Sequence, residues 1–485
     1  MMDYEVEQHV YFKHKNDGSM VREIHSDRLR FGFQLQLQTS SGEQRLFQRA
    51  ARRAWQSTGV AELRRGRPQV MPFESYARLC YPAALNATSP VGGPPGIVDQ
   101  PAFVEFRLAD GSAAGGLRTM AGGPGPSVVF DKLHNIFWWN NQHMATGFGL
   151  WGRELAGTAL GAVLSRNAEL TLNMTLSAPL STAGGSAGLW SSICTYNGTG
   201  ADCVWTGDLH SIAAPFTPAC IGNQSCDPGY TGAYWDINSD WNAAASVSKT
   251  AVMLLRFHTD VRADPRILAR VKRHADWLVR IATRFAGRVP FWWRPNSVDP
   301  VGWLSFNSHG GVHLQALADY ALLLPPSQRG PYVAAARLVV QQLSDEILPQ
   351  MRWADVETFY SCSNKPESAY DNFTKQPPRN TLSTGWAIDG LASMFELTRE
   401  QPFLRAAEEA ADYASLYQAH FEPTFIDRPK VAYVFGGMRS QNTDAEWLDM
   451  RQAVISEGFM RLGEHRVSWF RLCTLLLACS LAPPP

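Results

Sequence analysis

The sequence predicts a mainly α protein built from repeating helical hairpins, preceded by a β-rich N-terminal module. Three segments keep apolar residues at i, i+4, i+7/8 and i+11, the spacing of an amphipathic helix. Each has a proline near its first helical position, where the missing N–H costs nothing. These residues are Pro265, Pro331 and Pro402, spaced 331 − 265 = 66 and 402 − 331 = 71 positions apart. A unit of roughly 70 residues, long enough for two helices, therefore recurs.

The expected helices alternate between short turns and long connections. We expect them at 146–165, 241–258, 309–323, 384–398 and 447–462, with further helices opening near 264, 330 and 401. The long connections are 287–308, 348–383 and 420–446. Stacked pairs of this size form either an open solenoid or a closed (α/α) toroid. We count five hairpins, the last with only its first helix, so the array is predicted to be incomplete at its C-terminal end.

Three segments follow from this pattern. Residues 1–128 lack helical periodicity, and 31–38 and 103–108 alternate apolar and polar residues as half-buried strands do. Residues 129–465 form the helical domain. Residues 466–485 are an apolar and proline-rich tail, which we expect to lie outside the fold. Its uninterrupted apolar part is shorter than the ~20 residues that span a bilayer, so no membrane span is predicted.

Composition narrows the function. Lys plus Arg and Asp plus Glu both number 44, and this balance argues against a nucleic-acid partner. The 16 tryptophans suit packed helices and also a carbohydrate site, where flat rings stack on sugars. Four cysteines share one Gly/Ser-rich stretch without the paired spacing of a zinc site: Cys194, Cys203, Cys220 and Cys226. Disulfides, with nearby glycosylation sequons, predict a secreted or secretory-pathway protein, although residues 1–16 resemble no signal peptide.

The long connections carry the candidate chemistry. In a toroid they emerge at one end of the barrel and lead to inner-helix N-termini, where the helix dipole favours negative charge. If residues 353–359 are extended, Asp355 and Glu357 lie on one side between Trp353 and Phe359. Two carboxylates between aromatic rings suit a sugar site, in which rings hold the sugar and acids move protons. The alternative is a solvated strand whose acids are paired locally.

The connection 420–446 offers a second pair of acids. Thr443 and Glu446 have the spacing of a capping box, which would make Glu446 structural. Asp444 would then lie in the first helical turn, where the dipole keeps it ionised and suits it to act as a base. His309 and His313 lie one turn apart, and without a third ligand we expect them to hydrogen-bond or pack rather than bind zinc.

Four stretches also resemble a known family: FWWNN at 137–141, DVETFYSCS at 355–363, NTLS at 380–383 and QNTDAEWLDMRQ at 441–452. From about residue 129 to 462 the sequence is similar to the six-hairpin glycosidase-like superfamily, in a poorly characterised microbial branch. The resemblance implies an (α/α) toroid behind a β-rich module, and carbohydrate chemistry as a class. That class includes inverting hydrolases, polysaccharide lyases and uronosyl epimerases.

These observations together predict a glycoside hydrolase of the inverting, two-carboxylate type acting on an oligo- or polysaccharide. The candidate catalytic residues are Asp355, Glu357, Asp444 and Glu446. The candidate substrate-binding residues are Trp138, Trp139, Asn140, Trp235, Asp236, Trp293, Trp353, Trp386, Asn442 and Arg451. No metal or organic cofactor is expected, and the oligomeric state stays open.

Two other functions fit the same sequence. A uronate lyase or epimerase would need a cation, such as Arg379 or Arg451, and a base, such as Tyr360 or His309. A helical scaffold that binds glycan or protein without turnover would need no converging acids.

Overall fold

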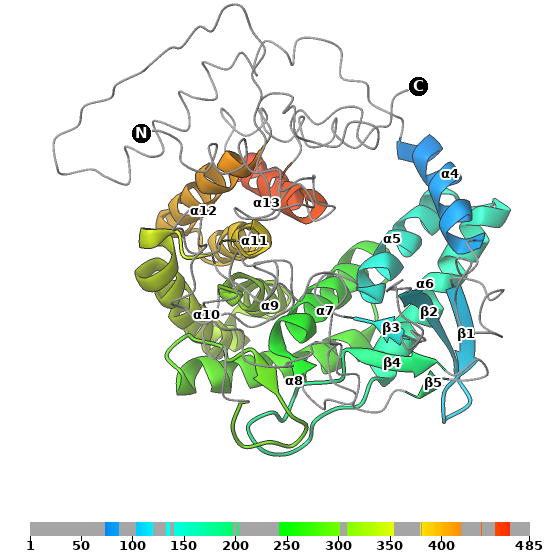
Figure 1. The fold of residues 1–485 in the computed structure, drawn as a ribbon, viewed down its shortest axis with the longest axis horizontal. Coiled ribbons are helices and arrows are strands. Elements are labelled where there is room, and N and C mark those ends of the chain that lie inside the picture. The colour runs from blue at the N-terminus through cyan, green and yellow to red at the C-terminus, as the bar shows by residue number, and fades with distance from the viewer. Residues whose placement is uncertain are drawn as a thin grey trace, which may run out of the picture.

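The helices form antiparallel pairs arranged in two layers. The computed structural model describes residues 73–86, 103–119, 132–135, 140–196, 201–202, 242–300, 308–353, 379, 381–418, 438 and 452–465. The paired helices are α5 (Asn141–Glu154) with α6 (Ala159–Ser177), α7 (Ala244–Arg256) with α8 (Pro265–Arg284), α9 (Gly310–Leu322) with α10 (Gly330–Gln342), and α11 (Thr381–Thr398) with α12 (Gln401–Ala414). Helix α13 (Gln452–His465) follows without a described partner. Figure 1 shows α7, α9 and α11 lying inside an arc of α8, α10 and α12.

Burial distinguishes the two layers. Every residue of α7 from Ala244 to Leu255 is buried, as in a helix surrounded by protein on all sides. Helix α8 instead buries one stripe that includes Ile267, Val271 and Leu278, and exposes the opposite face. Helices α5, α7, α9, α11 and α13 therefore form the inner layer, and α6, α8, α10 and α12 the outer layer.

The last inner helix reaches earlier inner helices across the barrel axis. Glu457 of α13 forms an ion pair with Arg256 of α7, and Arg461 of α13 lies 3.2 Å from Asp319 of α9. In an open solenoid each repeat contacts only its neighbours, so α13 could not reach α7. The fold is therefore an (α/α) toroid, which confirms the fold class predicted from the sequence and decides between the two arrangements left open.

Glycines set the spacing of the inner layer. A Cβ added to Gly390 of α11 would lie 2.4 Å from the Gly311 carbonyl oxygen of α9, and one added to Gly311 would lie 2.3 Å from the Ala387 nitrogen. A Cβ on Gly385 of α11 would likewise lie 2.9 Å from Ile455 of α13. Helices α9, α11 and α13 are thus held closer together than side chains would allow.

Most of the predicted helices are confirmed to within a few residues at their ends. The exception is 146–165, which is wrong because the chain breaks there into α5 and α6. Gly157 has φ +83°, and Thr158 caps the new helix by accepting a hydrogen bond from the Gly161 amide. A second difference is α4 (Phe73–Asn86), a helix in the region expected to lack helices. Its Tyr81 packs edge-on against Phe148 of α5, with ring centroids 5.5 Å apart.

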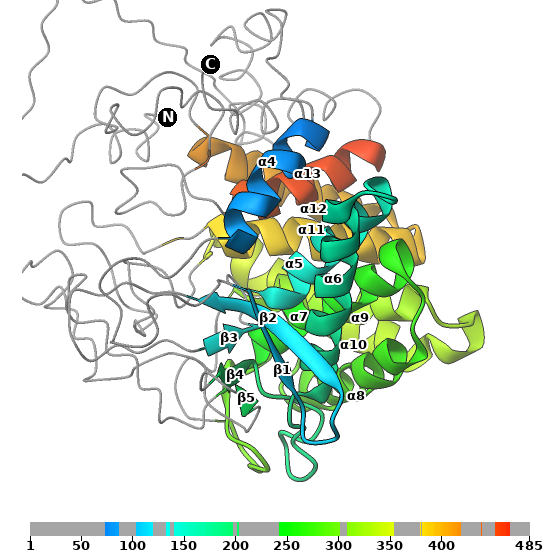
Figure 2. The same cartoon turned by 90° about the vertical axis from the view of Figure 1, so that its right-hand side faces the viewer.

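A five-stranded antiparallel sheet packs beside α6, as Figure 2 shows. The strands are β1 (Phe103–Arg107), β2 (Ala113–Thr119), β3 (Lys132–His134), β4 (Ile193–Tyr196) and β5 (Ala201–Asp202), paired in that order. The predicted strand at 103–108 is thus confirmed, and the one at 31–38 lies outside the described residues. Because β2 pairs with β3, the sheet crosses the boundary expected near residue 128. The buried Cys194 of β4 is disulfide-bonded to a cysteine outside the described residues, in agreement with the expected disulfides.

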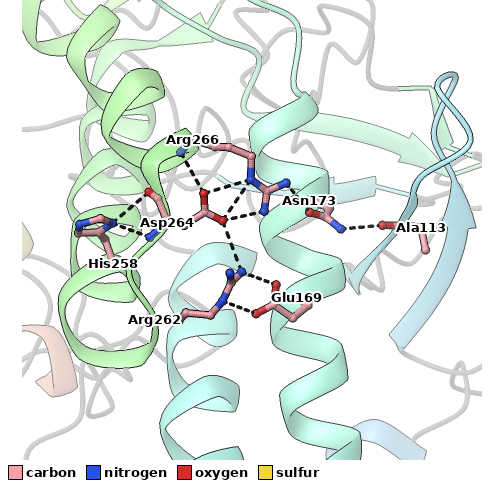
Figure 3. Close-up of polar contacts among 7 residues, drawn as sticks. All are labelled: Ala113, Glu169, Asn173, His258, Arg262, Asp264 and Arg266. Carbon is pink, nitrogen blue, oxygen red and sulfur yellow. Dashed lines mark hydrogen bonds and ion pairs between the residues drawn. The ribbon is translucent and has the colours of Figure 1, made fainter.

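Asp264 anchors a cluster of polar contacts at the turn between α7 and α8 (Figure 3). As the N-cap of α8 it accepts a hydrogen bond from the Arg266 amide at 2.9 Å and from its guanidinium at 2.7 Å. Arg262 lies 3.4 Å from the same carboxylate and also forms a bidentate pair with Glu169 of α6. Hydrogen bonds from Arg266, opposed by burial, lower the pKa of Asp264.

The cluster continues to the sheet through Asn173 of α6. Its side-chain oxygen accepts a hydrogen bond from the Arg266 guanidinium at 3.2 Å. Its side-chain nitrogen donates a hydrogen bond to the Ala113 carbonyl of β2 at 3.0 Å. Asn173 opens one of the glycosylation sequons, and its nitrogen is already used inside the fold. None of the described helices has the length and apolar character needed to cross a bilayer.

We predict that Gly390→Ala lowers the free energy of unfolding by about 1–3 kcal/mol, because the new methyl group would meet the α9 backbone. Gly330→Ala is the matched control, since a Cβ there meets nothing within 4 Å, and a gain of up to about 1 kcal/mol is expected. Urea unfolding followed by circular dichroism measures both. Equal effects of the two substitutions would show that the close approach does not constrain the layer.

A second prediction concerns acid stability. Asp264→Ala should cost about 1.5–3 kcal/mol at neutral pH, because the carboxylate accepts charged hydrogen bonds. Asp264→Asn should cost less, since an amide still caps the helix. The folded pKa lies below the unfolded value, so this stability is present above roughly pH 4 and is lost as the pH falls through the folded pKa. Parent and variant should therefore converge in acid, and a gap that persists at pH 2 would contradict the assignment.

Candidate functional site

The inner-helix N-termini lie at the end of the barrel that receives the long connections. Strand β6 (Asn242–Ala243), just before α7, pairs with β7 (Trp292–Trp293), which belongs to the connection before α9. Ser192, in the connection after α6, is hydrogen-bonded to Asn242, and the Asn242 amide donates to the Trp190 carbonyl. The connections before α7 and α9 therefore meet at one end, which we call the loop end.

A small aromatic core underlies the loop end. We call it the aromatic floor, and it comprises Phe291, Trp292, His309 and Trp386. His309 lies between two rings, with its centroid 4.8 Å from Phe291 and 5.4 Å from Trp386. All four side chains are buried, and burial, with a contribution from His313, holds the pKa of His309 well below its usual value. His309 is therefore a neutral imidazole at physiological pH.

A hydroxyl joins two further buried histidines below the floor. The Ser248 Oγ lies 2.7 Å from His274 Nε2 and 2.7 Å from His313 Nδ1. Burial lowers the pKa of both imidazoles, that of His313 to about 3, so both are neutral. A neutral imidazole offers one donor and one acceptor, so Ser248 can donate to one ring and accept from the other. The expected packing role of His309 and the hydrogen-bonding role of His313 are confirmed.

Charged residues occupy the barrel axis. Lys249 of α7 is 1% exposed, and burial and Arg256, opposed by Asp389, lower its pKa to about 8. Asp389 of α11 is fully buried, and burial raises its pKa against the opposing charges of Arg256, Arg461 and Lys249. We call Lys249 and Asp389 the axial pair.

The C-terminal ends of the inner helices carry charges that are paired. Arg461 of α13 forms a bidentate pair with Glu396 of α11 at 2.6 and 2.8 Å and also contacts Asp319. His465 lies 2.9 Å from the same Glu396 carboxylate. Although burial opposes it, the attraction of Asp319 and Glu396 raises the pKa of Arg461. Together with Arg256 and Glu457, these residues close the barrel at the end opposite the loop end.

The candidate catalytic acids Asp355, Glu357, Asp444 and Glu446 all lie outside the described residues. The same holds for six candidate substrate-binding residues: Trp138, Trp139, Trp235, Asp236, Asn442 and Arg451. Their roles stay predictions.

The other four candidates are buried in the protein. Asn140 caps α5 by accepting from the His143 amide and donates to Thr250 at 2.9 Å. Trp293 donates to the Pro290 carbonyl and packs against Trp277, while Trp353 lies in the main core. Trp386 belongs to the aromatic floor. Each has a packing or capping role here, and sugar contact by any of them stays a prediction.

Sequence reasoning did not select the axial pair or Ser248. In the sequence these residues differ from their neighbours only in being polar within otherwise apolar helices. That difference indicates a site only once the helices are known to be buried on all sides. Among the described residues, no group of three or more His, Cys, Asp or Glu side chains is arranged to hold a metal ion.

Comparison with known proteins identifies similarity in three dimensions. No family model matches the sequence, and no curated protein matches it. Among solved structures, a cellobiose 2-epimerase from Spirochaeta thermophila gives a TM-score of 0.43 and 11% identity, over 84% of this chain and 83% of that one. A sugar epimerase from a ruminal bacterium gives a TM-score of 0.41 and 10% identity, over 77% of this chain and 80% of that one. An unsaturated glucuronyl hydrolase specific for heparin gives a TM-score of 0.37 and 10% identity, over 89% of this chain and 83% of that one.

These three proteins are members of the six-hairpin glycosidase-like superfamily, which the sequence itself resembles. TM-scores this low support no inference about this chain, and neither its fold nor any residue role is taken from these proteins.

We predict that Ser248→Ala lowers the free energy of unfolding by about 1–3 kcal/mol, because both imidazoles lose their shared hydroxyl while remaining buried. Ser393→Ala is the matched control. Ser393 is also a buried serine on an inner helix, but within the described chain its hydroxyl has no hydrogen-bond partner, so the change should be near neutral. Chemical unfolding of the two variants measures both changes. Equal losses of unfolding free energy would mean that the contacts of Ser248 with the two histidines add no stability.

Proposed function

We propose that the protein is a carbohydrate-active enzyme, and that it hydrolyses a glycosidic bond with carboxyl groups held at the loop end of the toroid. The contact between the first turns of α11 and α13 carries the proposal. Gly385 and Ile455 meet there, so the connections that precede the two helices end at neighbouring points. Those connections contain Asp355 and Glu357 in the first case, and Asp444 and Glu446 in the second.

Fixed residues at the ends of these connections limit how far the acids can lie from the site. Trp353, two residues before Asp355, is fully buried in the main core. Asp444 lies eight residues before Gln452, the first residue of α13. We propose that both pairs of acids lie at the loop end, where a separation of roughly 6.5–9.5 Å would suit an inverting hydrolase.

The surroundings favour proton transfer. Apolar surface raises the pKa of a nearby carboxyl group, which lets it act as an acid at neutral pH. The aromatic floor provides such surface beneath the loop end. An inner-helix N-terminus favours an ionised carboxylate, which suits the base. We also propose an oxidising compartment, because the disulfide at Cys194 requires one to form and persist.

Amide substitutions test the hydrolase assignment. Asp444→Asn, and either Asp355→Asn or Glu357→Gln, should lower kcat by ~10²–10⁴ while folding and glycan binding persist, because amides keep the shape but transfer no proton. Glu400→Gln is the control, since this exposed carboxylate pairs with Arg337 and lies at the short turn between α11 and α12, away from the long connections. Reducing-end release from a panel of glycans measures turnover, and NMR of the first anomer formed tests for inversion.

The same assay discriminates the alternatives. A product absorbing as an unsaturated uronate would identify a lyase, and a changed sugar configuration without cleavage would identify an epimerase. Full hydrolysis by all three variants would remove the carboxylates from the mechanism.

A further inference from the structure

The axial pair is the most unusual polar feature of the described chain. The Lys249 Nζ and both Asp389 carboxylate oxygens have no hydrogen-bond partner there, although the two residues are 1% and 0% exposed. Buried polar groups in native proteins are nearly always hydrogen-bonded, and an unpaired one is costly. Every ion pair at the opposite end of the barrel is formed directly, so the axial pair stands apart from that cluster.

The two groups lie within electrostatic range of each other. Each charge acts on the other's pKa, and both respond to Arg256 and Asp319. Gln315 of α9 lies one turn before Asp319 on the same face, and both of its amide atoms lack partners within the described chain. Unsatisfied polar atoms from α7, α9 and α11 therefore converge on the barrel axis.

The axial pair lies between the loop end and the paired charges at the other end of the barrel. The paired charges of Arg461, Glu396 and Asp319 lie on the other side, at the C-terminal ends of the helices. Counting from the first residues of α7 and α11 at 1.5 Å per residue, Lys249 lies about 7.5 Å and Asp389 about 12 Å below the loop end. His143, near the start of α5, lies within electrostatic range of Lys249.

The donors and acceptors define the kind of ligand. An ammonium group only donates hydrogen bonds, a carboxylate only accepts them, and a carboxamide does both. A ligand that satisfies all three must present donors and acceptors on adjacent atoms, as vicinal hydroxyl groups do. The opposite charges of the axial pair balance, so the ligand needs no net charge.

We propose that Lys249 and Asp389 bind the hydroxyl groups of a neutral saccharide on the axis of the toroid, below the loop end. This inference rests on the proposed function and adds a substrate class and two contact residues to it. The sugar hydroxyls donate to the Asp389 carboxylate and accept from the Lys249 amine, which replaces the hydrogen bonds that the protein does not supply.

Calorimetric titration with neutral mono- and disaccharides tests the proposal. Asp389→Asn and Lys249→Met keep side-chain volume close to that of the parent, and each should weaken binding about 10- to 100-fold, the usual effect of one charged hydrogen bond. Lys272→Met is the control, because this exposed lysine pairs with Asp276 on the surface of α8, and binding should not change. Unaltered affinity in both axial variants would overturn the proposal, as would failure of the parent to bind any neutral saccharide.

A second measurement uses the parent protein and so does not depend on variants that fold. Reductive methylation at pH 8, mapped by mass spectrometry, reports the neutral fraction and accessibility of each lysine. A bound saccharide should slow methylation of Lys249 and leave that of Lys272 unchanged, and equal rates with and without saccharide would contradict the site. If saccharide binding depends on the axial pair but no glycan is cleaved, the hydrolase proposal is refuted and this inference stands. If glycan is cleaved and neither axial variant changes cleavage, this inference is refuted and the hydrolase proposal stands.

Discussion

The backbone contact between α9 and α11 is the constraint on which the rest of the structure depends. At Gly311 and Gly390 the two helices approach until no side chain fits between them. This spacing leaves α7, α9 and most of α11 buried on all sides, with the outer helices packed around them. Every polar side chain on an inner helix must then find a partner inside the protein or carry an energetic cost.

The inner layer meets that requirement in three ways. Near the loop end, His309 is neutral and packed between rings. One turn further along α9, His313 shares a hydroxyl with His274. At the far end, Arg461 holds two carboxylates. At the axial pair the buried groups without partners are charged, which is the costliest case, and this is why a ligand-binding role is proposed there.

The fold was largely predictable because its signals are local. Proline at the first helical position and a regular apolar stripe located α8, α10 and α12, and the alternation of short and long connections gave the pairing. The break at Gly157 and Thr158 was missed, since apolar residues continue across it in helical spacing. Helix α4 was missed because Pro82 lies inside it. Closure of the toroid depends on contacts between distant helices, which no local pattern contains.

The candidate site was less predictable for the same reason. Loop acids can be selected from their types and spacing, and their role stays a prediction because they lie outside the described residues. Lys249 and Asp389 matter only because of what surrounds them, and burial on all sides is a property of the assembled ring.

The ion pairs that join α13 to α7 and α9 have a consequence for how the chain folds. Arg461 contacts Asp319 across 142 residues of sequence, and the Arg256 pair with Glu457 spans still more. Contacts this distant in sequence raise the contact order and slow folding. During synthesis the first hairpins emerge long before α13, so Arg256 and Asp319 are at first without their partners Glu457 and Arg461. Docking of α13 against α7 and α9 is therefore expected to be a late step of folding.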